Sequence, residues 1–307
     1  MSELVDVKVE ADVWLSVSVS GQGDAVLFVH GWPHTHRLWE PLTALLGGVR
    51  RVIAPDLRGV GGSSRAATGY DARTLAGDLA TVIDDLVPDA AVDVVAIDAG
   101  VPPAFLLALQ RPDRVRTLVL MESTLGRLPG AEEFFAAGAP WWFGFHQVPG
   151  LAESVIVGNE GPYLDFFFAS GTYDRRGIPA DLRQAFVEAY SGRESIASGL
   201  GTYRAMPVSA QQIAAAAAAA GRLRMPVMAV GAQPVGDALS RQLEPIADDL
   251  RSELLQECGH IIPLDQPEPL RRLLLDFWQA PTSGKHRSLA RSRVSGGGLE
   301  PPPPFGD

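Results

Sequence analysis

Short apolar runs alternate with helical patterns over the first half of the chain. Buried strands are predicted by uninterrupted apolar runs at 24–31, within 50–59, at 92–97 and at 116–122. Between them, 75–87 places its apolar residues at helical spacing, and 102–110 predicts a helix with prolines in its first turn. This order of strands and helices favours an α/β fold, with a mostly parallel sheet flanked by helices on both faces.

The alternation stops at about Gly126 and returns in the last third of the chain. Residues 126–210 contain aromatic clusters and a helical pattern at 180–192, but no clear buried strand. We interpret this stretch as an inserted helical cap that lies over the main sheet. The predicted core then continues with an alanine-rich helix at 211–223, strands at 225–232 and within 251–260, and a helix at 268–279.

These patterns divide the chain into four parts. Residues 1–125 form the first part of the core, 126–210 the helical cap and 211–281 the second part of the core. The last part, 282–307, is basic, then glycine-rich, then proline-rich, and we expect it to be disordered because this composition cannot bury a core. A chain of 307 residues suits one large domain with such an insertion.

Composition and charge exclude several classes of function. The net charge of −10 argues against a surface that binds the phosphates of DNA or RNA. No run approaches the roughly 18 apolar residues of a membrane span, and the N-terminus lacks a signal-peptide pattern, so we expect a cytoplasmic protein. Cys258 is the one cysteine, which leaves no disulfide and no cysteine metal cluster, and we expect no metal and no cofactor. The sequence leaves open whether the chain forms a homodimer.

Asp98 stands at the turn between the predicted strand 92–97 and the helix that follows. Its small neighbours Ala96 and Gly100 allow a tight, strained turn that presents the central residue at the carboxyl edge of the sheet. The pattern is weak alone, but its place between a buried strand and a helix favours a functional role. A carboxylate with a pKa near ~4 is already ionised at neutral pH, so it can attack a saturated carbon without a base.

Three further segments accompany this turn. "HGWPHTHRLW" (30–39) and "DLRGVGGSS" (56–64) each follow a predicted strand, and "GHIIPLDQP" (259–267) precedes the final helix. Together with the turn at Asp98 they resemble the α/β-hydrolase fold, and more closely its aspartate-nucleophile branch of epoxide hydrolases and haloalkane dehalogenases. The resemblance covers roughly residues 5 to 280.

This resemblance implies a covalent mechanism. Asp98 would form an alkyl-enzyme ester, and water activated by His260 would hydrolyse it. The backbone amides of Trp32 and Ala99 would hold the oxyanion. His34 and His36, which follow Trp32, are expected to be exposed to solvent.

Two carboxylates compete to orient His260. Glu122 ends the predicted strand at 116–122, and Asp237 lies in the loop after the strand at 225–232. We prefer Glu122, because residues at strand ends reach a site built on the edge of the sheet. Asp237 would then be an ordinary acid of a loop or of a helix start.

The leaving group distinguishes the two branches. Dehalogenases of this fold commonly carry tryptophan directly after the nucleophile, and fluoroacetate-cleaving relatives carry arginines near it, whereas this chain has Ala99, Val101 and Pro102. Tyr203 and Trp142 stand where the epoxide hydrolases that this chain resembles carry donors for the epoxide oxygen. Tyr203 would give its proton, whereas an indole N–H only donates a hydrogen bond. The alternative for both residues is that they fill the core.

The flat side chains of the predicted cap favour an apolar or polycyclic aromatic epoxide. The predicted pocket residues are Trp141, Phe143, Phe145 and His146. His146 is also an alternative to Trp142 as the second donor. The composition and the segments around Trp142, Tyr203 and His260 resemble actinobacterial epoxide hydrolases of aromatic polyketide antibiotic biosynthesis, of the kinamycin and lomaiviticin type.

Two other functions are left open. One is a haloalkane dehalogenase, which Ala99 disfavours. The other is a catalytically silent protein of the same fold that binds a small molecule. The complete set of Asp98, Glu122 and His260 argues against the second, because a pure binder needs no nucleophile, acid and base. The expected partner is a small-molecule epoxide, and neither a nucleic acid nor a membrane.

Overall fold

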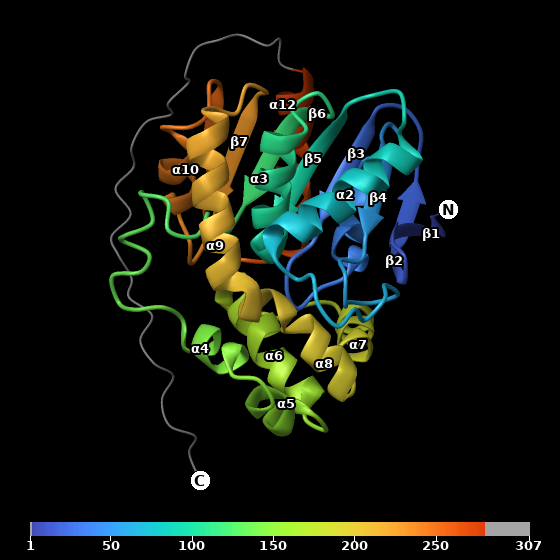
Figure 1. The fold of residues 1–307 in the computed structure, drawn as a ribbon, viewed down its shortest axis with the longest axis vertical. Helices are drawn as coiled ribbons and strands as arrows, with labels where there is room; N and C mark the ends of the chain where they lie inside the picture. The colour runs from blue at the N-terminus through green and yellow to red at the C-terminus, as the bar shows by residue number, and fades with distance from the viewer. Residues whose placement is uncertain (1, 280–307) are drawn as a thin grey trace.

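A computed structural model describes residues 2–279, and its strands form a single eight-stranded sheet (Figure 1). The strands are β1 (Glu3–Glu10), β2 (Val13–Ser20), β3 (Ala25–Val29), β4 (Arg51–Pro55), β5 (Val92–Ile97), β6 (Val115–Met121), β7 (Val227–Gly231) and β8 (Leu250–Leu254). Their order is β1-β2-β4-β3-β5-β6-β7-β8, with β1 and β2 antiparallel and all pairs from β4 to β8 parallel. The predicted α/β fold is confirmed, and the predicted tail 282–307 lies outside the described residues.

The hairpin of β1 and β2 was not predicted from the sequence. In β1, Val5, Val7 and Val9 alternate with charged residues, and only Val7 is fully buried. This pattern is typical of an edge strand with one exposed face, and it differs from the uninterrupted apolar runs of strands that are buried on both faces. The sequence signal of this edge strand is therefore the alternation of apolar and charged residues, which a search for continuous apolar runs does not detect.

Helices cover both faces of the sheet (Figure 1). Along β3, Ala25, Leu27 and Val29 pack in one core cluster with α2 (Ala72–Leu86) and α3 (Val101–Gln110). Val26 and Phe28 point to the opposite cluster, which contains the buried side chains of α12 (Pro267–Gln279). Successive residues of a strand point to opposite faces, so two covered faces require an apolar residue at every position. The remaining core helices are α1 (Glu40–Leu45), α10 (Ala238–Leu243) and α11 (Ile262–Asp265).

The chain between β6 and β7 forms the inserted helices, which we define as α4 to α9. They are α4 (Trp141–Gln147), α5 (Leu151–Ile156), α6 (Glu160–Ser170), α7 (Ala180–Ala189), α8 (Arg193–Gly199) and α9 (Gly201–Ala220). In Figure 1, α4 to α8 gather below the sheet, and α9 runs from this group back up beside α3.

The helix α9 begins at Gly201, whereas the sequence pattern predicts a start at 211. The difference arises from Pro207, which lies inside the helix. A proline there removes the N–H that would bond to the carbonyl of Tyr203, four residues earlier, and normally ends or kinks a helix. The helix continues because its two halves pack against α4 at one end and against α2 and α3 at the other.

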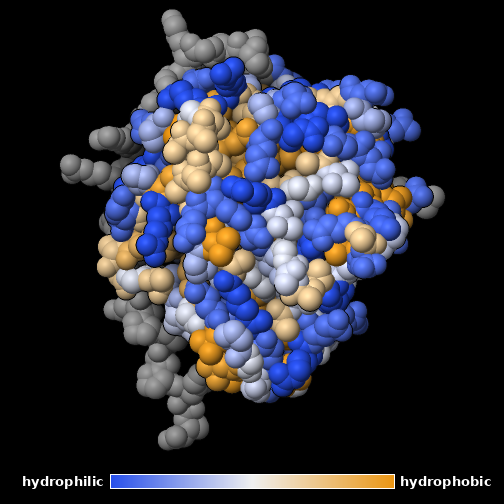
Figure 2. All heavy atoms as spheres, viewed as in Figure 1, coloured by the Kyte–Doolittle hydropathy of each residue, from blue (hydrophilic) through white to orange (hydrophobic). Residues whose placement is uncertain are grey.

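The outer surface mixes polar and apolar residues. Figure 2 shows a largely hydrophilic face, with pale apolar colour along the upper part of α9, where its alanines lie. Exposed apolar side chains of Trp141, Val148, Leu151 and Val155 gather on α4, α5 and the turn between them. Within residues 2–279, the structure contains no helix with the length and apolar character needed to cross a membrane.

Candidate active site

Asp98 lies directly after β5, in a turn that brings two loops into close contact. Its φ of 53° falls in the left-handed region, which costs a non-glycine residue about 1–3 kcal/mol unless the surroundings hold it. A Cβ on Gly31 would collide with the Asp98 side chain, and one on Gly100 would lie 2.5 Å from the carbonyl oxygen of His30. The loop after β3 therefore approaches the turn so closely that only glycine fits at these two positions.

The two carboxylate oxygens of Asp98 have different surroundings. Oδ1 accepts a hydrogen bond from the backbone N–H of Trp32 at 2.9 Å, and the backbone N–H of Ala99 also bonds to the carboxylate. Oδ2 lies 3.2 Å from Nε2 of His260. The side chain is 26% exposed. Oδ1 is thus held by the amide of Trp32, and Oδ2 faces the imidazole of His260.

The imidazole of His260 also contacts Glu122. Its Nδ1 lies 3.2 Å from Oε2 of Glu122, whose carboxylate is fully buried. Oε1 of Glu122 accepts the backbone N–H of Ala232 at 2.6 Å, and Oε2 accepts that of Val235 at 3.4 Å. The Asp98 carboxylate, the His260 imidazole and the Glu122 carboxylate thereby form a continuous chain of contacts. Asp98 and Glu122 directly follow β5 and β6, and His260 lies in the loop after β8.

Asp237 does not take part in this chain of contacts. Its carboxylate is 59% exposed and forms an ion pair with Arg241, four residues later in α10. Of the two carboxylates that the sequence left in competition, Glu122 is the one in contact with His260. The loop of Ala232 to Val235 binds the Glu122 carboxylate through its amides, and Asp237 lies beyond it.

The two carboxylates change the protonation of His260. Burial lowers the pKa of this imidazole, but hydrogen bonds and charges of Asp98 and Glu122 outweigh burial and raise the pKa to about 10. For Asp98, burial acts to raise the pKa, and His260 together with the amides of Ala99 and Trp32 outweighs it, so the pKa is lowered. At neutral pH the site therefore holds an imidazolium between two carboxylates. Loss of the Asp98 charge would lower the pKa of His260.

Aromatic rings from the inserted helices surround the loop after β3. The ring of Tyr203 lies 5.6 Å from that of Trp32 and 4.5 Å from that of His146, and His146 lies 4.8 Å from Trp32. Burial and the nearby Asp98 charge raise the pKa of Tyr203 well above 10, while a hydrogen bond from Trp142 acts in the opposite direction. Tyr203 therefore carries its proton throughout the neutral range.

The four predicted pocket residues do not all lie beside Tyr203. Phe143 lies 5.7 Å from Tyr203, and His146 is fully buried beside it. Phe145 packs against His146 and Tyr163, at 5.8 and 6.1 Å between ring centres. Trp141 is 55% exposed and contacts Trp142 and Phe166, so its ring lies at the outer surface of α4.

The histidines near the site have partners that were not predicted. Nε2 of His146 lies 2.5 Å from the hydroxyl of Tyr163, and burial lowers the pKa of His146 to about 3. The expected exposure of His34 is wrong: its ring is buried against Phe186 of α7, and its pKa is lowered to about 3. His36 is also largely covered, because its Nδ1 lies 2.8 Å from Oδ1 of the buried Asp56. These contacts depend on how the inserted helices and neighbouring loops pack, and no local sequence pattern signals them.

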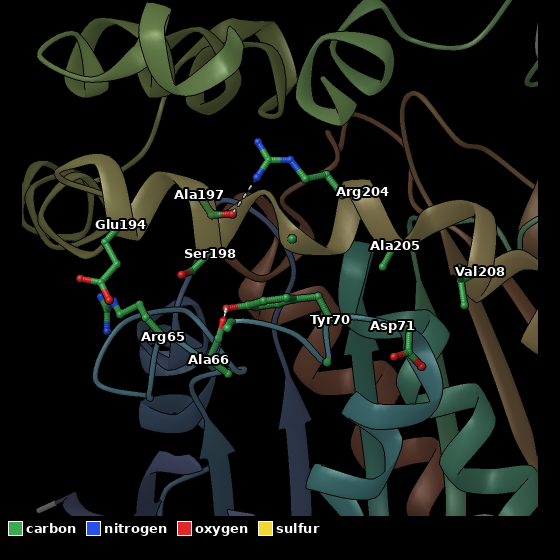
Figure 3. A pocket seen from close by; sticks show the side chains of 13 residues that line it. Arg65, Ala66, Tyr70, Asp71, Glu194, Ala197, Ser198, Arg204, Ala205 and Val208 are labelled. Carbon is green, nitrogen blue, oxygen red and sulfur yellow. Dashed lines mark hydrogen bonds between the residues drawn. The ribbon is translucent and has the colours of Figure 1, made fainter. Parts of the chain in front are cut away.

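A groove of about 660 Å³ lies apart from Asp98 (Figure 3). In Figure 3, Tyr70 lies beneath the helices that carry Ser198 and Arg204, and the Arg204 side chain points away from it. The two arginines of the groove have partners within the fold, since Arg65 donates to two carbonyls and Arg204 binds Glu153. Its lining residues include no histidine, in contrast to the site at Asp98.

Comparisons with known proteins agree with the α/β fold. A family model described as the alpha/beta hydrolase fold matches residues 24–267. A soluble epoxide hydrolase of Corynebacterium sp. (strain C12) is 26% identical over 279 residues, which cover 84% of this chain and 91% of that protein. A fluoroacetate dehalogenase of Burkholderia sp is 27% identical over 210 residues, covering 66% and 68%. The crystal structure of Cfl2 from Burkholderia cenocepacia aligns with a TM-score of 0.80 at 28% identity, over 91% of this chain and 95% of that one.

Proposed function

The chain belongs to the α/β-hydrolase family, and from this premise we propose that it is an epoxide hydrolase that forms a vicinal diol through an ester on Asp98. The observation that carries the proposal is the set of contacts around His260. Its Nε2 lies 3.2 Å from Asp98 and its Nδ1 lies 3.2 Å from the buried Glu122. The similarity to a soluble epoxide hydrolase over most of both chains supports the same reaction.

In the first half-reaction, Asp98 opens the epoxide. Oδ2, which faces the imidazole of His260, attacks a ring carbon as the carbon–oxygen bond breaks. The departing oxygen takes the hydroxyl proton of Tyr203, whose raised pKa keeps it protonated until then. The indole N–H of Trp142 donates a hydrogen bond that positions this oxygen.

In the second half-reaction, His260 hydrolyses the ester. Ester formation removes the Asp98 charge, so the pKa of His260 falls and the imidazolium gives up a proton, which passes through solvent to the Tyr203 phenolate. The neutral imidazole can then accept a proton from water. Water attacks Cγ of Asp98, and the backbone amides of Trp32 and Ala99 stabilise the negative charge on Oδ1, each by about 3 kcal/mol. The bond from Cγ to Oδ2 then breaks, and the diol leaves with the proton from His260. The carboxylic acid left on Asp98 passes its proton to His260, which regenerates the carboxylate and the imidazolium.

The inserted helices supply the substrate specificity in this proposal. They act as a cap whose rings, among them Phe143, Trp142 and Phe167, surround the reacting groups with flat apolar surface. Such a lining favours an apolar or polycyclic aromatic epoxide. The resemblance of the sequence motifs extends this proposal to an epoxide of aromatic polyketide biosynthesis.

Displacement of a halide is the second candidate reaction, because a fluoroacetate dehalogenase is among the similar proteins. An aspartate that attacks a saturated carbon can displace either an epoxide oxygen or a halide. Ala99 offers no side-chain donor beside the nucleophile, and Val101 and Pro102 offer no cation for a carboxylate substrate. Release of halide from a panel of small haloalkanes and from fluoroacetate would favour this second candidate.

A single-turnover reaction in heavy-oxygen water tests the ester mechanism. With the enzyme in excess over styrene oxide, water should place its oxygen in the Asp98 carboxylate, and the first diol should contain none. Mass spectrometry of the diol and of the peptide that carries Asp98 measures both. Heavy oxygen in the first diol, with an unlabelled peptide, would mean that water attacks the epoxide directly.

Tyr203→Phe should slow ring opening more than Trp142→Phe. Loss of the proton donor should reduce the rate of ester formation by about 100-fold, whereas loss of one hydrogen bond should cost about tenfold. Rapid-quench mass spectrometry of the ester with styrene oxide measures this rate. Tyr190→Phe is the matched control, because this buried tyrosine also packs against Trp32 but bonds to the carbonyl of His34. If both changes had equal and negligible effects on the rate of ester formation, Tyr203 and Trp142 would have no role in ring opening.

The free energy of unfolding should fall as the pH rises from about 7 to 9. The pKa of His260 is about 10 in the folded protein and 6.5 as the ordinary value, so only the folded state keeps this proton in that range. The stabilisation is complete below pH 6.5 and is lost as the pH rises through the folded pKa. Urea denaturation at several pH values should show a flatter dependence for His260→Gln than for the wild type. Identical slopes would contradict the raised pKa.

A further inference from the structure

We propose that Asp265 is a positioning residue that ties the His260 loop to the inserted helices, so that the placement of these helices sets the position of the base. The inference rests on the proposed function, because it assigns His260 to the hydrolysis of the ester. It concerns a carboxylate that contacts none of the reacting groups.

The Asp265 carboxylate joins two distant segments of the chain. It lies at the end of α11 with a side chain that is 1% exposed. Oδ2 accepts the backbone N–H of Gly259, directly before His260, at 2.6 Å, and that of Tyr173 at 2.8 Å. Oδ1 pairs with the guanidinium of Arg176 at 2.7 Å. Tyr173 and Arg176 belong to the turn between α6 and α7, so one carboxylate holds the base loop and the insertion together.

A second contact holds the other side of His260. The backbone N–H of Ile261 donates to the carbonyl of Gly171 at 2.8 Å. A Cβ on Gly259 would lie 2.6 Å from the same carbonyl oxygen, so the two backbones touch directly. Both neighbours of His260 are thereby attached to the segment 171–176 of the insertion.

These attachments are tighter than the contacts of the imidazole itself. The ring lies 3.2 Å from both Asp98 and Glu122, longer than the usual 2.7–2.9 Å of a charge-assisted hydrogen bond. The backbone on either side is held at 2.6 to 2.8 Å. The loop thus has a fixed place relative to the insertion, and a displacement of about 1 Å there can cost about 100-fold in rate.

The same segment follows the helix that lines the site. The ring of Phe167 in α6 lies 4.7 Å from that of Trp32 and 5.5 Å from that of Trp142. The helix ends at Ser170, immediately before Gly171. A substrate that displaces these rings therefore shifts the segment 171–176, and Asp265 transmits the shift to His260.

Asp265→Asn and Arg176→Met test this coupling. Asparagine keeps the shape, but its single acceptor oxygen cannot serve the backbone N–H groups and Arg176 together. Arg176 is 54% exposed, so its replacement leaves the core intact and provides a milder variant. The matched control is Arg183→Met, which breaks an exposed ion pair with Asp165 inside the insertion and away from the His260 loop.

Rapid-quench mass spectrometry with styrene oxide separates ester formation from ester hydrolysis in each variant. In Asp265→Asn, ester hydrolysis should slow by about 10- to 100-fold, with ester formation within about twofold of the wild type, so the ester accumulates. Arg176→Met should show the same pattern with a smaller change, and Arg183→Met should match the wild type.

The outcomes distinguish the inference from the function on which it rests. Equal slowing of both steps in Asp265→Asn would mean a purely structural ion pair, and unchanged hydrolysis in both variants would also overturn the inference, while the ester mechanism would stand. A wild-type enzyme that releases diol without an ester would overturn the proposed function and this inference with it.

Discussion

Asp98→Asn should lower the rate of diol formation by at least about 10⁴-fold, as the loss of a nucleophile does in enzymes that work through a covalent intermediate. The amide oxygen is uncharged and a weak nucleophile, and the amide nitrogen cannot accept the hydrogen bond that Trp32 donates to Oδ1. No ester should form, and no mass increase should appear on the peptide that carries residue 98. Diol formation from styrene oxide and intact mass spectrometry measure the two effects.

Asp237→Asn is the matched control for this variant. It makes the same chemical change at the carboxylate that competes with Glu122 in the sequence but pairs with Arg241 in the structure. Its activity should equal that of the wild type. Substantial diol formation by Asp98→Asn, or a loss of activity confined to Asp237→Asn, would contradict the site described here.

His260→Gln should limit the enzyme to a single reaction with substrate, because the ester forms but is not hydrolysed. Ester formation should continue because Oδ2 of Asp98 needs no base to attack, but glutamine cannot take the proton of the hydrolytic water. The rate of ester hydrolysis should fall by about 10²- to 10⁴-fold, the usual contribution of a general base. One molecule of styrene oxide should remain bound to each enzyme molecule, on the peptide that carries Asp98.

The double variant Asp98→Asn with His260→Gln is the control for the trapped ester. It should show no adduct, because the attacking oxygen is lost as well. Continued turnover by His260→Gln without an adduct would show that the imidazole plays no part in the second step. An adduct in the double variant would place the covalent bond on another residue.

The predicted and observed strands agree where a strand is buried on both faces. The runs at 92–97 and 116–122 correspond to β5 and β6, because a strand covered on both sides must be apolar at every position. The edge hairpin of β1 and β2 escaped this criterion, since one of its faces is exposed. The prediction also missed the start of α9. Pro207 is typical of the end of a helix, but packing against α4 and α3 keeps the helix continuous through this residue.

The α/β fold and the place of Asp98 in a strand-to-helix turn could be predicted from the sequence, because both depend on the spacing of apolar and small residues within a short segment. Three features become visible only in the folded chain: Glu122 and not Asp237 touches His260, His34 is buried, and Asp265 binds both the His260 loop and Tyr173. These are contacts between segments far apart in the chain. Local patterns record which face of an element is apolar, and they carry no information about which distant side chain packs against it.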